Sequence, residues 1–214
     1  MPTPSRQDRR KSRTRDALIG AAEALFAARG PDAVSVDEIV ARADTAKGSF
    51  YNHFADKDAL AREIARGVRG EIEREIDTVN AGIADPAARV ARALCVFSKF
   101  ARLHPDRIRA ISHFHSGATD PAAPLNAGVR RDVTEGIESG RFSTTAPEAA
   151  ILLVIGTVQA SFHRALVTGE AAMRRTTPAM AALLLRGLGL KTAEAETVAR
   201  DAADAVFGTK GKTP

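Results

Sequence analysis

Apolar residues recur at intervals of three and four along most of the chain, the spacing that places them on one face of an α-helix. The first such stripe consists of Leu18, Ala21, Ala22, Leu25 and Phe26. It predicts a helix over about residues 12–29, which Gly30 and Pro31 end. Alternating runs of Val, Ile and Thr, typical of β-strands, are nearly absent. The pattern therefore predicts an all-α protein.

Local signals divide the next fifty residues into three further helices. Ser35 and Glu38 have the spacing of a capping box, which predicts that a short helix starts there. Residues 44–46 break the pattern before a helix over 47–54, and Asp56 is the predicted cap of a long fourth helix. The apolar face of that fourth helix is formed by Leu60, Ile64, Val68, Ile72 and Ile76.

Proline residues mark the starts of most of the later helices. Proline is tolerated in the first helical turn because the N–H that it lacks has no helical partner there. A helix from Thr192 is the last, and the tail over 209–214 is expected to be loose. The later helices predicted in this way span about residues 86–103, 105–115, 122–139, 147–168, 178–188 and 192–207.

The composition is that of a globular chain, with 214 residues of which 44% are hydrophobic. Cys95 is the single cysteine, so the chain can form neither an intrachain disulfide nor a cysteine zinc cluster, and the cytoplasm is the expected compartment. No apolar run follows the basic residues at the start, which argues against a signal peptide. The most apolar stretch, residues 149–162, is expected to be too short to span a bilayer.

The net charge of the chain is concentrated at its N-terminus. Residues 1–15 hold six basic side chains against Asp8, a net charge of +5, which equals the formal net charge of the whole chain. A basic arm on a neutral body is what a polyanion partner requires, because each Lys or Arg that meets a phosphate releases counterions. A solvated tail has the same composition, so the elements that follow the arm must decide between the two.

The predicted helix over 47–54 is built to display polar groups. Phe50 and Phe54 lie on one face, and the other faces carry Lys, Ser, Tyr, Asn and His. Together with the short helix before it and the longer first helix, it matches a helix-turn-helix, in which the second short helix enters the major groove of DNA.

These residues resemble the TetR family of bacterial regulators. The resemblance covers about residues 12–65 and lies in three segments, Ser35 to Ala43, Lys47 to Phe54 and Lys57 to Leu60. It implies a tri-helical DNA-binding domain over 12–56, preceded by a basic disordered arm over 1–11. A helical ligand-binding and dimerisation domain is then expected over 57–208.

The resemblance also implies which residues contact DNA. Tyr51, His53 and Lys57 are expected to bind phosphates. The expected set is completed by base-edge or nearby backbone contacts from Lys47, Ser49 and Asn52, close approach at Gly48, and contacts from Ser35 and Thr45.

The turn over 44–46 departs from the family pattern, which favours Gly at its first position and Ser or Thr at its last. Asp44 is expected to keep the geometry, since Asp is among the few residues that tolerate a left-handed backbone. Ala46 cannot cap the next helix, so Asp44 or Thr45 is expected to cap it instead.

The helix over 147–168 is apolar nearly all round and must be covered on several sides. It is either the central core helix of a monomer or, as the resemblance implies, part of a four-helix dimer interface with 178–188. The interface residues expected from the second reading are Val154, Ile155, Val158, Phe162 and Leu184.

The middle helices are expected to hold a small organic ligand, since related regulators have their cavity there. The candidate lining residues, each of which is also compatible with a plain core, are Phe97, Phe100, His113, Phe114, His115 and Gln159. Metal sensing is not expected, because His113 and His115 are two residues apart on a helix and no cysteine or acid lies at ligand spacing.

The function expected is that of a dimeric repressor that binds a palindromic operator and is released by a small organic inducer, with no cofactor. An enzyme is not expected, because the chain lacks a phosphate-binding glycine loop, a nucleophile elbow and a spaced His/Glu metal motif. Two alternatives stay open, a redox regulator acting through Cys95, which has Arg92 and Lys99 one turn away, and a DNA-binding protein without sequence preference.

Overall fold

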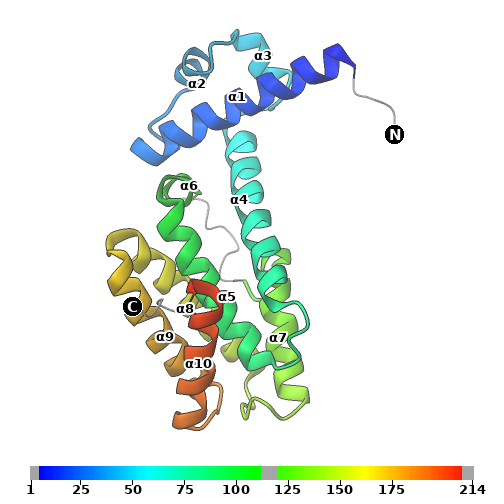
Figure 1. The fold of residues 1–214 in the computed structure, drawn as a ribbon. Helices are drawn as coiled ribbons and strands as arrows, with labels where there is room; N and C mark the ends of the chain where they lie inside the picture. The colour runs from blue at the N-terminus through cyan, green and yellow to red at the C-terminus, as the bar shows by residue number, and fades with distance from the viewer. Residues whose placement is uncertain (1–4, 112–119, 209–214) are drawn as a thin grey trace. The chain divides into compact units, whose positions relative to one another are not determined.

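The computed structural model of the chain describes residues 5–111 and 120–208 (Figure 1). Within these ranges every regular element is helical, and no strand occurs. The all-α fold class predicted from the apolar spacing is confirmed.

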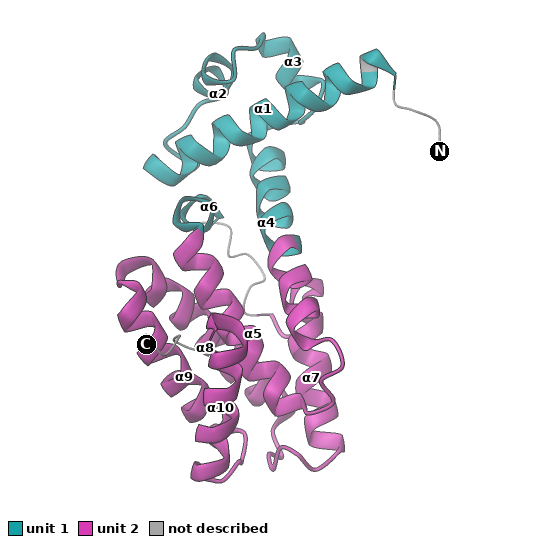
Figure 2. Ribbon diagram, in the orientation of Figure 1, with its two compact units in different colours: residues 1–70, 104–115 teal, residues 71–103, 116–214 magenta. Residues whose placement is uncertain are grey.

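The helices form two compact units (Figure 2). The first contains residues 1–70 with 104–115, and the second contains 71–103 with 116–214. The division falls inside one helix, α4 (Lys57–Asn80), whereas the sequence placed a domain boundary in front of it. The first half of α4 therefore belongs to the first unit.

The first unit consists of α1 (Arg6–Arg29), α2 (Val36–Arg42), α3 (Lys47–Tyr51), the first half of α4, and α6 (Pro105–Ile111). Helices α2 and α6 both pack on α1. Its core is formed by fully buried side chains from four of these helices, namely Leu18, Ala22, Phe26, Ile39, Phe50 and Leu60. This core holds the short helix α3 in place although α3 is too short to be stable alone.

Helix α1 begins six residues earlier than predicted, at Arg6. Ser5 caps it, and Asp8 completes a capping box whose pattern the apolar spacing could not reveal. The arm predicted as disordered over 1–11 is thus helical from Arg6 onward.

The second unit is organised around α5 (Pro86–Leu103), which packs against α7 (Ala127–Glu138), α8 (Pro147–Val167), α9 (Glu170–Gly187) and α10 (Thr192–Phe207). Eleven of the 18 residues of α5 are buried, so it is the core helix of this unit. A short 3-10 turn, η1 (Pro124–Asn126), precedes α7 where the sequence predicted a helix from 122.

Helix α9 starts at Glu170, eight residues before the predicted start, and contains Pro178 in its interior. Proline there removes one backbone hydrogen bond, which is why the sequence placed it at a helix start. Met173 and Thr177, on the turns before the proline, are 4% and 3% exposed. Their burial offsets the missing bond and carries the helix through the proline.

Helix α8 has 21 residues and is the one described helix that is long and apolar enough to cross a membrane by length and composition. The expectation that this stretch is too short for a bilayer is therefore wrong. Core helices of helical domains have the same composition, and α8 packs against α5, α7 and α9. Only 39% of its most apolar window is buried within the chain, so much of an apolar helix faces outward.

Candidate nucleic-acid interface

The predicted capping box fixes the start of α2. The Glu38 N–H donates to the Ser35 hydroxyl at 3.2 Å, and the Ser35 N–H donates to the Glu38 carboxylate at 2.8 Å. Arg29 at the end of α1 also donates to Glu38, at 2.7 Å. The hydrogen bonds from Ser35 and Arg29 lower the pKa of Glu38 to about 2. The carboxylate thus stays ionised and ties α2 to α1.

The turn between α2 and α3 has the predicted left-handed residue. Asp44 has a φ of 49°, and it is the only described non-glycine residue with a positive φ. Ala46 is the N-cap of α3 and no side chain makes a capping hydrogen bond there. The expectation that Asp44 or Thr45 caps α3 is therefore wrong, and α3 starts without a side-chain cap.

Helix α3 is anchored by aromatic side chains. Phe50 is fully buried, and its ring lies 5.8 Å from the ring of Phe54. The guanidinium of Arg15 from α1 lies over the Phe54 ring at 5.7 Å. These contacts fix the inner face of α3, so the residues between the two phenylalanines turn outward.

The outer face carries the residues that the sequence assigned to DNA. Tyr51 is 54% exposed, although its ring touches the edge of Phe50 at a centroid distance of 5.3 Å. Lys47, Gly48 and Asn52 are exposed as well. Ser49, His53 and Thr45 are half-buried, and Ser35 is exposed but engaged in the capping box. The structure thus gathers polar groups around one short helix.

Two lysines of this surface already have partners inside the protein. The Lys47 Nζ lies 2.8 Å from the Asp37 carboxylate of α2. The Lys57 Nζ donates to the Val34 carbonyl at 2.9 Å, which ties the start of α4 to the loop before α2. Lys57 therefore has a structural contact that the sequence did not reveal.

His53, two residues after the end of α3, lies in a cationic environment. The pKa of His53 is lowered, mainly by partial burial and further by the charges of Lys11 and Arg15. Both cations belong to the N-terminal half of α1, which therefore approaches the C-terminal end of α3. The sequence placed Lys11 in a disordered arm and had no signal for this proximity.

The candidate ligand residues that the structure describes lie in the second unit. Phe97 and Phe100 are on α5, half-buried and 4% exposed respectively, and Gln159 is half-buried on α8. These two helices pack together. The other candidates, His113, Phe114 and His115, lie outside the described residues. In the ranges that are described, no group of three or more His, Cys, Asp and Glu could hold a metal ion.

The residues expected at the dimer interface are mostly inside the single chain. Val154, Ile155, Val158 and Leu184 are 3 to 8% exposed, and a second copy could add little to their burial. Phe162 is half-buried and stacks on His163 at 4.2 Å. The outward apolar residues of the same two helices are Leu152, Leu153, Val167 and Leu183.

Cys95 is fully buried in α5. Burial raises the pKa of its thiol to about 12. The basic neighbours noted in the sequence are engaged elsewhere, since Arg92 donates to the Val79 carbonyl at 2.5 Å and Lys99 to Glu75 at 3.2 Å. A redox role for this thiol has no support in these surroundings, because the thiolate is the reactive form.

Comparison with known proteins matches both parts of the chain. Residues 18–64 match bacterial regulatory proteins of the tetR family, and residues 85–201 match the tetracyclin repressor-like C-terminal domain. Among curated relatives, the transposon Tn10 TetC protein of Escherichia coli is 38% identical over 60 residues, 28% of this chain and 30% of that protein. The repressor KstR2 of Rhodococcus jostii is 39% identical over 66 residues, 31% of this chain. The chain thus spans about a third of either relative, 32% in the case of KstR2.

Solved structures extend the similarity to nearly the whole chain. RolR without ligand is 29% identical with a TM-score of 0.61, and the match covers 86% of this chain and 95% of RolR. RolR in complex with resorcinol is 28% identical with a TM-score of 0.60, covering 89% of this chain and 95% of that one. The C-terminal match alone spans more than half of the residues. The chain therefore belongs to the tetR family of bacterial regulatory proteins.

Proposed function

We propose that this protein is a ligand-responsive transcriptional repressor that binds a palindromic operator as a dimer in the cytoplasm. The observation that carries the proposal is the exposed polar face of α3, which rests on the buried Phe50 inside the matched DNA-binding region. A helix displayed in this way suits the major groove, where base edges differ between all four base pairs.

The side chains around α3 divide between positioning and reading. Tyr51 and His53 are assigned to phosphates, which fix the register of the protein on the duplex without reading its sequence. Lys57 joins them, since its bond to the Val34 carbonyl leaves two of its three N–H donors.

Lys47, Ser49 and Asn52 are assigned to base edges or nearby backbone. A Cβ added at Gly48 would meet nothing within 4 Å, so packing inside the chain does not require glycine there. Close approach of DNA gives this glycine a purpose that offsets its cost in a helix.

Dimerisation is assigned to the outward apolar residues of α8 and α9. Leu152, Leu153 and Leu183 are 39%, 41% and 63% exposed in the single chain. A Cβ added at Gly187 would lie 2.9 Å from Leu153, so the two helices approach closely at this face. A second copy that covers it would create a twofold protein, which matches an inverted repeat in DNA.

The ligand is assigned to the second unit, near Phe97, Phe100 and Gln159. RolR, with 28% identity over 89% of this chain, has been solved with resorcinol. An aromatic ring with one or two polar groups fits a mainly apolar site with few polar partners. We therefore expect an aromatic compound or an acyl compound with one polar end.

The proposal is tested by selecting duplexes from a random-sequence library with the full-length protein and footprinting the selected sequences. The expected result is an inverted repeat with half-sites about one helical turn apart or somewhat more. A pool that stays random would instead support a DNA-binding protein without sequence preference. Protection of one half-site by one subunit would overturn the twofold model.

Ligand control is tested by titrating a panel of phenols and acyl compounds, resorcinol included, into the protein–operator complex. An inducer is expected to weaken operator binding about 5- to 150-fold, the usual range of coupling between two sites. Calorimetry must then show that the operator weakens binding of the same compound by the same factor. Unequal factors at equilibrium would contradict a direct coupling.

A further inference from the structure

The first two turns of α1 carry an exposed row of arginines. Arg6, Arg9, Arg10 and Arg13 follow each other at intervals of three, one and three residues, and all four are exposed. Residues three, four and seven apart lie on one face of a helix. We call this set the arginine stripe. The buried residues of α1, such as Leu18 and Ala22, lie on another face.

The stripe belongs to an ordered helix with a defined start. The Asp8 N–H donates to the Ser5 hydroxyl at 3.1 Å, and the Ser5 N–H donates back to the Asp8 carboxylate at 3.1 Å. The Ser5 hydroxyl also donates to this carboxylate, at 2.7 Å. A capping box of this kind typically stabilises a helix start by about 1 kcal/mol. The arginines are therefore presented in a fixed register.

The stripe differs from two other arginines of this unit, which have acidic partners. Arg15 pairs with Glu63 at 2.5 Å and Arg29 with Glu38 at 2.7 Å. Among the residues that the structure describes, no carboxylate forms an ion pair with a stripe guanidinium. Four like charges on one face repel each other, and a polyanion would relieve that repulsion.

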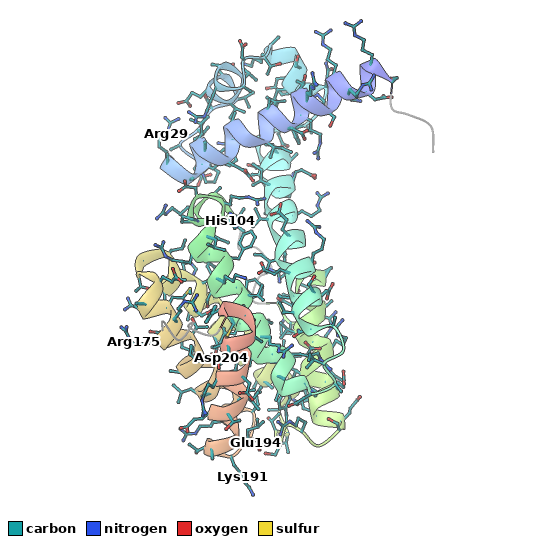
Figure 3. The ribbon with its side chains drawn as sticks, viewed as in Figure 1. Arg29, His104, Arg175, Lys191, Glu194 and Asp204 are labelled. Carbon is teal, nitrogen blue, oxygen red and sulfur yellow. The ribbon has the colours of Figure 1, made fainter. Side chains whose placement is uncertain are left out.

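The N-terminal end of α1 that carries the stripe lies beside the end of α3, although another face of this helix makes the contact. Lys11, within the same two turns, acts on the pKa of His53 at the end of α3. Arg15, one turn further along α1, lies over the ring of Phe54. Nitrogen-tipped side chains project from the N-terminal turns of α1 (Figure 3). Lys11 and Arg15 lie four residues apart on the face of α1 that also carries Leu18 and Ala22. The stripe therefore occupies the outer face of the same helix end whose inner face lies near α3.

We propose that the arginine stripe binds the DNA phosphate backbone beside the bases that α3 contacts, and that it does so as a helix in fixed register. This inference rests on the proposed function and adds a second DNA-binding surface to it. A phosphate backbone is the occupant that fits, because its charges are regularly spaced and a guanidinium binds phosphate with two parallel hydrogen bonds.

The test measures the affinity of full-length variants for the library-selected duplex as a function of KCl concentration. Affinity falls as salt rises, so the slope of log affinity against log salt is negative. Replacing all four stripe arginines by glutamine should make this slope less steep by about 2 to 4, at roughly 0.9 for each phosphate that no longer binds an arginine. An unchanged slope would overturn the proposal. If wild-type protein selects an operator and only this slope is unchanged, the stripe alone is refuted and the repressor proposal stands.

A second variant separates a helix in register from a charged tail. Exchanging two neighbours, Ser12→Arg with Arg13→Ser, keeps the composition and charge but moves one arginine off the stripe. If the stripe binds as a helix, the slope of log affinity against log salt should become less steep by about 1. If the segment binds as a flexible tail, the slope should not change. Equal slopes for this variant and wild type would refute the fixed register. Circular dichroism and thermal unfolding of each variant confirm that the fold is retained.

Discussion

Asp37 and Lys47 join the first turn of α2 to the first turn of α3, with the Lys47 Nζ 2.8 Å from the Asp37 carboxylate. The hydrogen bond from Lys47 to Asp37 raises the pKa of the lysine. Lys47 is thus held protonated but partly neutralised at the surface that we assign to DNA. It has to leave Asp37, or share its three N–H donors, when it contacts a base or a phosphate.

Asp37→Asn should therefore strengthen binding to the selected operator by about two- to fivefold, because exposed ion pairs are weak and the released lysine gains a phosphate or base partner. Fluorescence anisotropy with a labelled duplex measures the effect. Asp58→Asn is the control, since it removes the same charge from the neighbouring helix α4. An equal gain in both variants would show that only net charge matters.

Adjacent residues of α3 should respond to substitution in opposite ways. Tyr51→Phe removes one hydroxyl from a side chain that is 54% exposed, so thermal stability should not change while binding to every duplex weakens alike. Phe50→Ala removes a fully buried ring and should destabilise the fold by about 3 to 5 kcal/mol. Denaturant unfolding and anisotropy separate the two effects. A change in sequence preference with Tyr51→Phe would show that this residue reads bases.

The two ion pairs of Arg89 in α5 test how burial changes the contribution of an ion pair to the free energy of unfolding. Its Nε donates to Asp132 at 3.0 Å and its Nη2 to Glu135 at 2.5 Å, while the side chains of these acids are 7% and 50% exposed. Asp132→Ala should lower the free energy of unfolding by about 1.5 to 3 kcal/mol, because the guanidinium loses its buried partner but keeps Glu135 and the Ile83 and Ala84 carbonyls. Glu135→Ala should cost about 1 kcal/mol or less. Equal effects of the two substitutions would contradict this account.

The parts of the fold that the sequence predicts are those set by neighbouring residues. The Ser35 and Glu38 capping box, the left-handed Asp44 and the cap of α4 by Asp56, at 2.6 Å from the Ala59 nitrogen, depend on interactions within a few positions. The apolar period likewise locates the buried face of α4, where Leu60, Ile64, Val68 and Ile72 are all at most 3% exposed.

The parts that the sequence does not predict depend on residues far apart in the chain. Arg141 pairs with Asp85, 56 positions away, at 2.8 Å, and also with Glu194 of α10. Such pairs follow from packing and have no local pattern. Pro178 inside α9 is the same case, since burial of the preceding turns overrides its local preference for a helix start. The expected dimer residues Val154, Ile155, Val158 and Leu184 illustrate the same limit, because they are buried within the single chain and apolarity alone does not separate residues facing the core from those facing a partner.

Cys95 should not act as a redox sensor. With a pKa of about 12, its thiolate fraction at pH 8 is about one in ten thousand, so alkylation by iodoacetamide in the native state should be slow. Hydrogen peroxide should leave operator binding unchanged in wild type and in Cys95→Ala alike. Loss of binding on peroxide treatment in wild type, absent in Cys95→Ala, would establish the redox alternative.

The last prediction concerns the face of α8 and α9 that we assign to the dimer. Leu183→Glu changes a residue that is 63% exposed in the single chain, so the fold of the protomer should be kept. In a dimer that buries this face, the substitution places an unpaired carboxylate against apolar side chains, which costs several kcal/mol for each ion. Light scattering should then show a monomer at concentrations where wild type is a dimer.

A core variant separates loss of dimerisation from loss of folding. Val154→Ala changes a residue of α8 that is 3% exposed, so it should lower the unfolding temperature while the dimer remains. The Leu183→Glu monomer should in turn lose tight binding to a two-half-site operator, because only a twofold protein contacts both half-sites at once. It should still bind a single half-site as weakly as one wild-type subunit would. A Leu183→Glu protein that remains dimeric would place the interface elsewhere on the second unit.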